Sequence, residues 1–285
     1  IEIKKQSLSE TFSVYLDKRM IRILLLGAIS GFPWVLIGSS LSLWLKEEGL
    51  SRSTIGWAGL IFGVYAINYF WAPLVDRIKI PLLTNKFGHR RGWIFSMQAL
   101  ILISLIIWSY INPTENLYLL IFVGLIIAIA SATQDITVDA LRIEQIKQSE
   151  KKAMAAGAAI AVVGWWSGYK IGGVISLFTA EYFENIGIVN YWQKTFLILG
   201  IIVILMNIAL IFVQESKNIS REKVHTKNDK IAERKIITSS QNSLIFFIGI
   251  ALFIFIEAYL LSKILGNHFF NFIPNTIFFN ILIFI

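Results

Sequence analysis

The chain has 285 residues, of which 56% are hydrophobic and 15% are charged, and it carries a formal net charge of +8. Soluble domains usually hold about 25% charged residues. The lack of cysteine excludes a disulfide bond, a thiol nucleophile and a cysteine-ligated metal. The composition therefore predicts an all-α protein that crosses a membrane several times, whose excess positive charge belongs to its loops rather than to a nucleic-acid partner.

Apolar stretches of about twenty residues, the length that crosses ~30 Å of hydrocarbon, recur along the chain. They predict spans at residues 22–45, 53–75, 92–111, 117–139, 153–180, 191–213 and 244–262, and an eighth apolar run from 272. The corresponding domains are a cytoplasmic N-terminal segment (1–21), a six-helix transmembrane bundle (22–213), a charged cytoplasmic linker (214–243) and an incomplete start of a second transmembrane half (244–285). Because the chain opens on Ile1 and stops within an apolar run, we expect a fragment or a truncated product.

Basic residues concentrate in alternate loops, beginning with the N-terminal segment and the loop between the second and third spans. The opposite loops hold only Lys46, Arg52, Lys194 and Lys263. Loops rich in Lys and Arg remain in the cytoplasm. The distribution therefore predicts a cytoplasmic N-terminus.

The loop after the second span reads WAPLVDRIKIPLLTNKFGHRRGW (71–93) and gathers charge at the cytoplasmic surface. Asp76 and Arg77 end the span, and Arg90 and Arg91 precede the next one. An acid beside clustered cations can form ion pairs that one conformation makes and another breaks. These four residues are predicted to form a conformational latch. The alternative is that they only set the membrane topology.

The fourth span ends in SATQDITVDALR (131–142), where Asp135 and Asp139 lie one turn apart on one helix face. A charged carboxylate inside the hydrocarbon costs ~2.5–3.5 kcal/mol on insertion scales. Low dielectric and a second acid nearby both favour the protonated form. We therefore expect proton coupling at Asp135, with Asp139 beside it. For Asp139, nearer the surface, the alternative is an ion pair with a cation of the inner latch, namely Arg77, Arg90, Arg91 or Arg142.

Lys170 lies in the middle of the fifth span, in GWWSGYKIGGVIS (164–176). An intramembrane cation marks a solute pathway by default, so Lys170 is predicted to bind an anionic group. The alternatives are snorkelling and a structural ion pair. The same stretch spaces Gly164, Gly168 and Gly172 four residues apart, which predicts close helix packing.

Other polar and aromatic residues inside the spans are weaker candidates for solute contact. Gln134, Asn68 and Trp165 are predicted to bind solute, although Gln134 could equally bond within the bundle. Gly31 and Pro33 predict a kink in the first span, close to Ser30 and Ser40. Further residues that could line the site, or simply pack, are Trp34, Trp44, Trp166 and Glu257.

Enzymatic functions have little support in this sequence. His89, His225 and His268 fall in loops or at a span end, so no embedded histidine serves an acyltransferase or a zinc site. An intramembrane aspartyl protease needs two acids that meet across helices, and no Walker-type phosphate loop is present. The sequence predicts no enzymatic activity, no metal and no cofactor.

Four motifs follow one another on successive helices: SGFPWVLIGSSLSLWL (30–45), FWAPLVDR (70–77), FGHRRGW (87–93) and SATQDITVDA (131–140). Over residues 20–215 the chain resembles the AmpG-type muropeptide permeases of the major facilitator superfamily. The resemblance implies a bundle of two six-helix halves in the bacterial inner membrane. It also implies import of cell-wall anhydro-muropeptides, driven by the proton gradient. On this resemblance the chain corresponds to the N-terminal six-helix half plus one or two further helices.

Two alternatives stay open beside muropeptide import. A carrier for peptides, acyl-coenzyme A or another anion would share the same helices and inner loop. A truncated membrane protein without transport activity would insert but take up nothing. The expected partners are a small-molecule solute, protons and the lipid bilayer, and a separate chain is considered as the source of the second half.

Overall fold

A computed structural model describes residues 14–146, 149–213 and 215, all within the first of two compact units, Ile1–Lys217. Apart from Glu215, the predicted linker lies outside the described residues. The same holds for the seventh span with Glu257, for the last apolar run, and for Lys263, His225 and His268.

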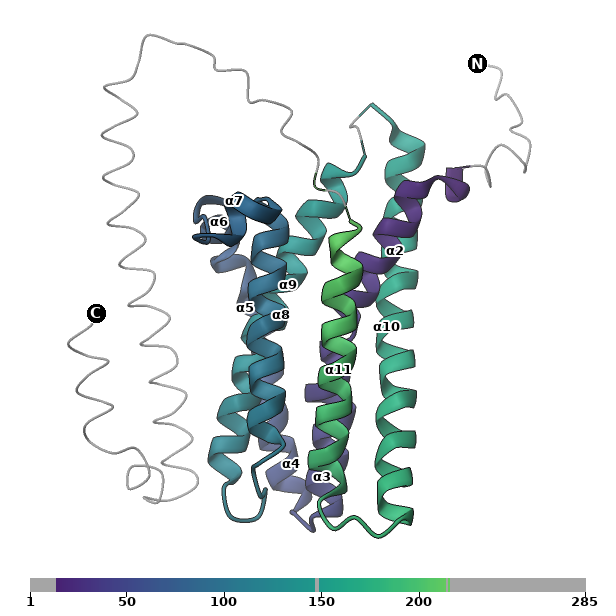
Figure 1. The fold of residues 1–285 in the computed structure, drawn as a ribbon. Coiled ribbons are helices and arrows are strands. Elements are labelled where there is room, and N and C mark those ends of the chain that lie inside the picture. Colours follow the sequence, from purple (N-terminus) through teal and green to yellow (C-terminus); the bar gives the residue numbers. More distant parts are fainter. Residues whose placement is uncertain (1–13, 147–148, 214, 216–285) are drawn as a thin grey trace, which may run out of the picture. The chain divides into compact units, whose positions relative to one another are not determined.

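Helices make up the described part of the chain, which contains no strand. Figure 1 shows the long helices lying side by side. In chain order the elements are η1 (Val14–Leu16), α2 (Lys18–Gly31), η2 (Val35–Ser40), α3 (Leu41–Glu47), α4 (Arg52–Ala58), η3 (Gly59–Phe62), α5 (Gly63–Ile67), η4 (Asn68–Phe70), α6 (Ala72–Arg77), α7 (Leu83–Phe87), α8 (His89–Trp108), α9 (Leu117–Glu144), α10 (Lys151–Asn185) and α11 (Tyr191–Ile211).

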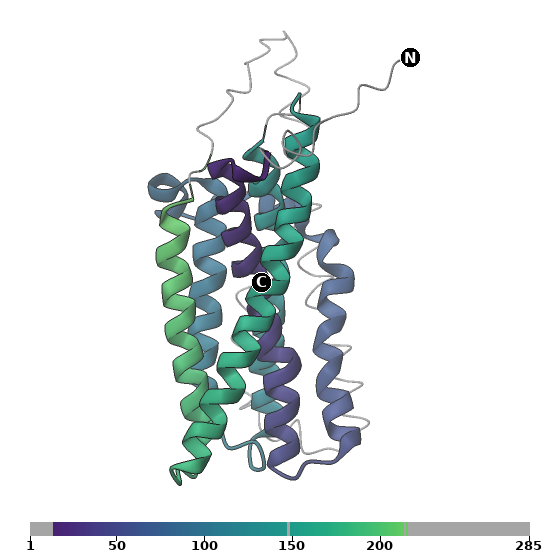
Figure 2. The same ribbon diagram turned by 90° about the vertical axis from the view of Figure 1, so that its right-hand side faces the viewer.

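Five helical stretches of the described residues are long and apolar enough to cross a membrane: Lys18–Glu47, His89–Trp108, Leu117–Glu144, Lys151–Asn185 and Tyr191–Ile211. They correspond to the first and the third to sixth predicted spans. The second predicted span is instead divided into α4, η3, α5, η4 and α6. Figure 2 shows these short segments following one another in a single column. Gly56, Gly59 and Gly63 fall within them, and glycine weakens a helix interior by about 1 kcal/mol relative to alanine.

The first span is also irregular, as Gly31 and Pro33 predict. Helix α2 ends at Gly31, and a π-helical turn, η2, separates it from α3. Proline lacks the amide hydrogen that an α-helix needs at this point, so the regular bonding pattern is interrupted. A π-helical turn inside an α-helix often occurs at a functional site.

Glycines allow α2 and α10 to pack with their backbones in contact. A side chain added at Gly164 or Gly168 of α10 would collide with the carbonyl oxygen of Leu24 or Ala28 in α2. At Gly172 a side chain would meet the Phe32 ring at 2.7 Å. The predicted packing role of this glycine stripe is therefore confirmed, and α10 is held close to the site-bearing helix α2.

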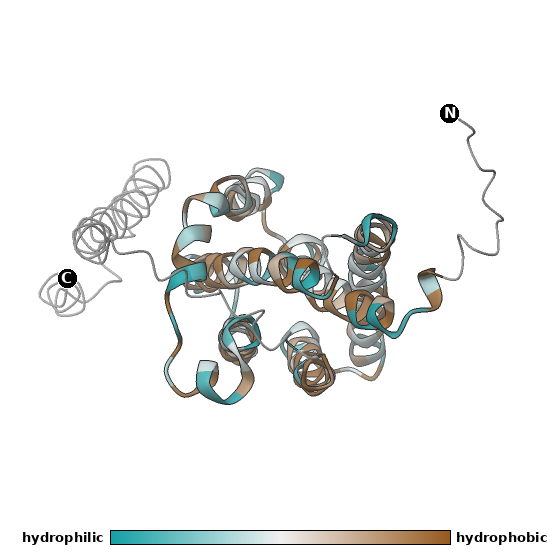
Figure 3. Ribbon diagram, turned by 90° about the horizontal axis from the view of Figure 1, so that it is seen from above, coloured by the Kyte–Doolittle hydropathy of each residue, from teal (hydrophilic) through white to brown (hydrophobic). Residues whose placement is uncertain are grey.

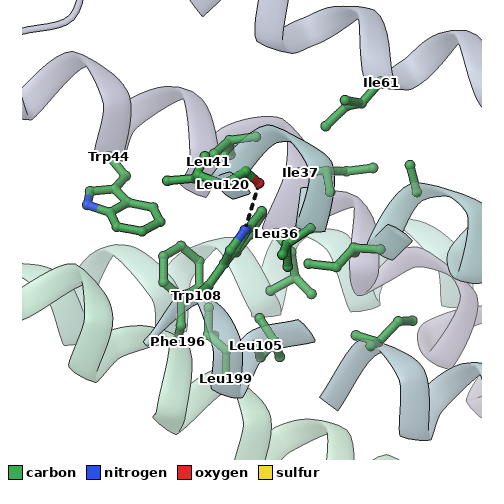
Figure 4. Close-up of a cluster of buried hydrophobic side chains, with 14 of the residues drawn as sticks. Leu36, Ile37, Leu41, Trp44, Ile61, Leu105, Trp108, Leu120, Phe196 and Leu199 are labelled. Carbon is green, nitrogen blue, oxygen red and sulfur yellow. Dashed lines mark hydrogen bonds between the residues drawn. The ribbon is translucent and has the colours of Figure 1, made fainter. Parts of the chain in front are cut away.

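The bundle core is aromatic where α3, α8, α9 and α11 meet. Trp108 packs against Trp44 and Phe196, with ring centroids 6.2 and 5.0 Å away. Its indole nitrogen donates a 3.0 Å hydrogen bond to the Leu120 carbonyl oxygen (Figure 4). The polar end of this buried tryptophan is thus satisfied within the bundle.

Large hydrophobic side chains remain exposed along the outer helices, and Figure 3 shows hydrophobic residues along much of the helical ribbon. On α10 and α11 they include Val162, Val163, Val174, Phe178, Ile201, Leu205 and Ile208. A monomeric soluble protein rarely exposes so much apolar surface, whereas hydrocarbon covers it at no cost.

Substitution of Gly168 by alanine is expected to lower the free energy of unfolding by about 1–3 kcal/mol, because the added methyl group meets the rigid backbone of Ala28. Gly173 in the same helix is the matched control, since nothing lies within 4 Å of a side chain placed there. Thermal unfolding of both variants in detergent micelles compares them. Equal midpoints for Gly168→Ala and Gly173→Ala would contradict the close backbone contact.

Candidate functional site

Asp135 is half-buried on α9, nine residues or ~13 Å before the helix ends at Glu144. The Ser30 hydroxyl of α2 donates a 2.5 Å hydrogen bond to Asp135 Oδ1. Among the described residues no cation forms an ion pair with Asp135. Its contact is thus with a neutral donor, so the carboxyl group is free of a permanent counter-charge.

Four polar side-chain atoms near Asp135 are buried without a well-aligned hydrogen-bond partner: Trp34 Nε1, Tyr65 OH, Ser131 Oγ and Gln134 Oε1. Trp34, which directly precedes η2, and Tyr65 of α5 lie beside the Asp135 carboxyl group. Leaving a buried polar atom unpaired costs about 1–3 kcal/mol. A cluster of such atoms next to an acid therefore offers binding positions for water or for polar groups of a solute.

Aromatic rings surround this polar cluster and join three helical columns. The Trp34 ring centroid lies 4.6 Å from Tyr65, 5.0 Å from Phe62 and 5.5 Å from Trp165. Trp165 stacks on Tyr169 with centroids 5.8 Å apart. We call Trp34, Phe62, Tyr65, Trp165 and Tyr169 the aromatic cluster. Flat rings beside polar atoms suit a solute that has both apolar faces and hydrogen-bonding groups.

The residues that the sequence predicts to bind solute lie at different places in the bundle. Gln134 is fully buried and donates a 2.8 Å bond from Nε2 to the Ile29 carbonyl oxygen, so its amide nitrogen serves packing while its oxygen stays unpaired. Lys170 is exposed on α10, with Nζ 5.7 Å from the Trp166 and Tyr169 ring centroids. Asn68 lies in η4 and is partly exposed. Of the residues predicted to bind solute, only Gln134 and Trp165 therefore lie next to Asp135 or in the aromatic cluster.

Asp139 differs from Asp135 although one turn separates them. Its side chain is 68% exposed and forms a 3.1 Å ion pair with Arg142 on the same helix. This is one of the partners that the alternative interpretation of Asp139 named. The two acids therefore occupy unlike environments.

The predicted latch residues meet at one end of the bundle. Arg90 bridges two acids, forming a hydrogen-bonded ion pair with Asp76 and a 3.1 Å one with Glu144. Arg91 donates from Nη2 to the Ile211 carbonyl oxygen at 3.2 Å. Arg77 ends α6 and also has an interaction partner. The pairs join α6, α8 and α9, so a movement between these elements must break them.

Glu215, just beyond α11, caps the start of α8. Its carboxylate accepts hydrogen bonds from the backbone amides of His89, Arg90 and Arg91, at 2.9, 3.2 and 3.1 Å. An anion at a helix N-terminus satisfies free amides and is favoured by the helix dipole. Glu215 therefore ties the chain segment after α11 to the latch.

Sequence reasoning missed Glu144 and Glu215 in the latch, and Tyr65 and Ser131 beside Asp135. A signal existed for Glu144, because an acid in the last turn of a helix opposes the dipole unless a cation pairs with it. No comparable local signal marks the other three, since their roles depend on residues far away in sequence.

The described residues contain no group of three or more His, Cys, Asp or Glu side chains that could hold a metal ion. The site chemistry on this part of the chain is therefore that of an acid, hydroxyl groups, amides and aromatic rings. Such a constellation inside a bundle of membrane-length helices is the architecture of a solute transporter.

The family comparison agrees with this class. The chain belongs to the major facilitator superfamily, whose family model matches residues 23–284. The prediction of an all-α membrane protein of this superfamily is thereby confirmed, and in line with the prediction of no enzymatic activity, its relatives are named as transporters and permeases.

Individual relatives carry the names of transporters and permeases. A Rickettsia felis protein named putative transporter AmpG 4 is 39% identical over 212 residues, covering 74% of this chain and 49% of the relative. A Rickettsia bellii protein named putative transporter AmpG 1 is 34% identical over 232 residues, covering 81% and 55%. The Escherichia coli K12 anhydromuropeptide permease is 32% identical over 173 residues, covering 61% and 34%. The chain thus spans about half, or less, of the length of these curated relatives.

Substitution of Glu215 by glutamine is expected to speed hydrogen exchange at the amides of His89, Arg90 and Arg91 by about tenfold or more. Hydrogen bonds to a charged acceptor contribute about 1.5–3 kcal/mol, and the neutral amide forms weaker ones. Exchange followed by mass spectrometry on the chain in nanodiscs measures the change. Glu181→Gln, at an exposed acid of α10, is the control and should leave these amides unaffected. Unchanged exchange in Glu215→Gln would contradict the capping role.

Proposed function

We propose that this chain is part of a proton-coupled secondary transporter that imports cell-wall muropeptides, or a related anionic solute, into the cytoplasm. The observation that carries the proposal is the environment of Asp135, an acid inside an apolar bundle whose hydrogen-bond donor is the neutral hydroxyl of Ser30. The printed name of the Escherichia coli relative, anhydromuropeptide permease, supports the solute class.

Asp135 is proposed to bind and release the coupled proton. An ionised carboxylate in a low-dielectric interior needs hydrogen-bond donors, and Ser30, Trp34 and Tyr65 offer a hydroxyl, an indole N–H and a phenol nearby. Water that enters from one side stabilises the ionised carboxylate of Asp135. When the water leaves, the protonated carboxyl group is favoured. A proton can therefore load from one side and leave to the other as access alternates.

Asp139 is proposed to assist this step from the inner side. Its ion pair with Arg142 keeps a negative charge one turn from Asp135. A like charge at that distance opposes ionisation of Asp135, and any rearrangement of the Asp139 pair changes this repulsion. Asp139 would thus tune the proton site without being its main carrier.

The solute is proposed to bind against the aromatic cluster and the unpaired oxygen of Gln134. Trp165 would provide a ring face, and Asn68 and Lys170 would contact parts of the solute that extend beyond the cluster. Muropeptides carry several carboxylates, which suit an intramembrane cation such as Lys170. Lys170 has no acid partner among the described residues, which leaves it available for such a group.

Asp76, Arg77, Arg90 and Arg91 are proposed to form the latch of the cytoplasmic gate. Their ion pairs and the Glu215 cap would hold the inner ends of α6, α8 and α9 together in one state and release them in another. A second six-helix half, in the same or a separate chain, would complete the solute pathway. The proposed location is the bacterial inner membrane with a cytoplasmic N-terminus, on the strength of the basic loops.

Substitution of Asp135 by asparagine is expected to reduce proton-dependent uptake to background, because an amide cannot release a proton, while membrane insertion stays at the wild-type level. The measurement is uptake of radiolabelled 1,6-anhydro-N-acetylmuramyl tetrapeptide by bacteria that lack their own muropeptide permease, with and without an uncoupler. Glu181→Gln is the matched carboxyl-to-amide control and should retain uptake. Asp139→Asn should retain part of it. Wild-type uptake in Asp135→Asn would refute the assignment.

Competition experiments separate muropeptide import from the alternative anion carriers. Unlabelled muropeptide should suppress the uptake of the labelled compound at micromolar to millimolar concentrations. Acyl-coenzyme A or a simple peptide should have little effect at the same concentrations, because neither presents a sugar face together with several carboxylates. Stronger competition by either of these compounds would show that its class, rather than the muropeptides, contains the solute.

A further inference from the structure

An open cavity with mostly apolar walls lies at the end of the bundle opposite the latch, where α3 turns into α4. It has a volume of about 580 Å³ and is lined by Ser39, Ser42, Leu43, Lys46, Gly49, Leu50, Arg52 and Ile55. Two cations and two hydroxyl groups therefore face one small open space. The proposed functions of the central site and of the latch use none of these residues.

The acids next to these cations are engaged elsewhere. Glu47 accepts hydrogen bonds from the Tyr191 hydroxyl at 2.8 Å and the Trp192 indole at 2.5 Å. Glu48 accepts a 3.2 Å bond from the Trp44 indole. Aromatic donors of α3 and α11 thus hold both carboxylates, and neither forms an ion pair with Lys46 or Arg52.

Lys46 and Arg52 consequently have no acidic partner within the part of the chain that the structure describes. A pair of cations that form no ion pair attracts anions more strongly in a concave site than on a flat surface. Both cations line the cavity and neither neighbouring acid does, because the aromatic donors hold the two carboxylates outside its lining.

The cavity and the aromatic cluster lie along the same predicted first span, because η2 and α3 connect Trp34 to the residues of the cavity. Phe62 belongs to that cluster, and its ring lies 3.4 Å from the position of a side chain at Gly38, directly before the cavity residue Ser39. The π-helical turn η2 (Val35–Ser40) connects Trp34 to this wall. Twelve residues separate Trp34 from Lys46, which corresponds to ~18 Å along a helix. One elongated solute can span that distance.

We propose that Lys46 and Arg52 form a carboxylate-binding subsite that receives the anionic end of the transported solute. This inference rests on the proposed function, and it assigns the carboxylate-bearing peptide portion to the cavity while the remainder reaches the aromatic cluster. Arg52 can bind a carboxylate with two parallel hydrogen bonds, Lys46 adds a point charge, and Ser42 adds a hydroxyl donor, whereas the Ser39 hydroxyl donates to the Val35 carbonyl oxygen at 3.3 Å. Because the cavity is open to solvent, its contribution to affinity is moderate and sensitive to salt.

Chemical protection of lysines in the intact chain tests the subsite. The chain is placed in nanodiscs of phosphatidylcholine and treated with a water-soluble acetylating reagent, with citrate or 1,6-anhydro-N-acetylmuramyl tetrapeptide as the probe. Each probe should slow acetylation of Lys46 at least threefold without protecting Lys194, an exposed lysine at the same end of the bundle. Arg52→Gln should abolish the protection, and Arg52→Lys should restore part of it.

Binding affinity provides the second measurement. Lys46→Gln combined with Arg52→Gln should weaken binding of the muropeptide at least tenfold. The same variant should not change binding of an analogue whose carboxyl groups are amidated. Lys194→Gln should leave both affinities unchanged.

The outcomes separate this inference from the proposed function. Equal protection of Lys46 and Lys194, or equal muropeptide affinity in the double variant and the wild type, overturns the subsite. Protection that appears on adding phosphatidylglycerol rather than either probe also overturns it, because the cations then hold a lipid phosphate. Protection by citrate without any muropeptide binding retains the anion subsite and overturns the proposed solute.

Discussion

Hydrocarbon supplies no hydrogen-bond partners, and the rest of this structure follows from that constraint. Each polar group inside the bundle must be satisfied by the protein, by water or by a solute. Most are: the Trp108 indole bonds to Leu120, and the Gln134 amide nitrogen bonds to Ile29. Among the described residues, three exceptions lie at His89, Arg91 and Gln193, and the other four lie together beside Asp135. Within a bundle that is otherwise well satisfied, they identify the position at which something else is bound.

Backbone irregularity serves the same site. Helix α2 ends before the π-helical turn η2, and the second column is a series of short helices. Both irregular segments contribute side chains to the aromatic cluster, through Trp34 and through Phe62 and Tyr65. The regular helices α9 and α10 hold this region in place, and glycine contacts bring α10 against α2. A rigid frame therefore surrounds the part of the bundle that is least regular.

Charge is organised differently at the two ends of the bundle. At the latch end, acids and cations pair across helices, with Arg90 between Asp76 and Glu144. At the opposite end, aromatic donors hold the acids, and Lys46 and Arg52 form no ion pair with any described residue. Cross-helix pairs resist separation of the elements they join, whereas unpaired cations attract an anion. The same residue types thus favour closure at one end and binding at the other.

The sequence by itself determined the features that are local. Apolar runs established the membrane-spanning class, Pro33 predicted the break in the first span, and an acid in an apolar helix singled out Asp135. The sequence predicted a continuous second span, whereas the structure has a series of short helices there. Only the tertiary structure decided that Ser30 faces Asp135, that Glu215 caps α8 and that Glu47 turns away from Lys46. These contacts join residues far apart in the chain, and they depend on how each helix is rotated and packed, which a periodic pattern does not specify.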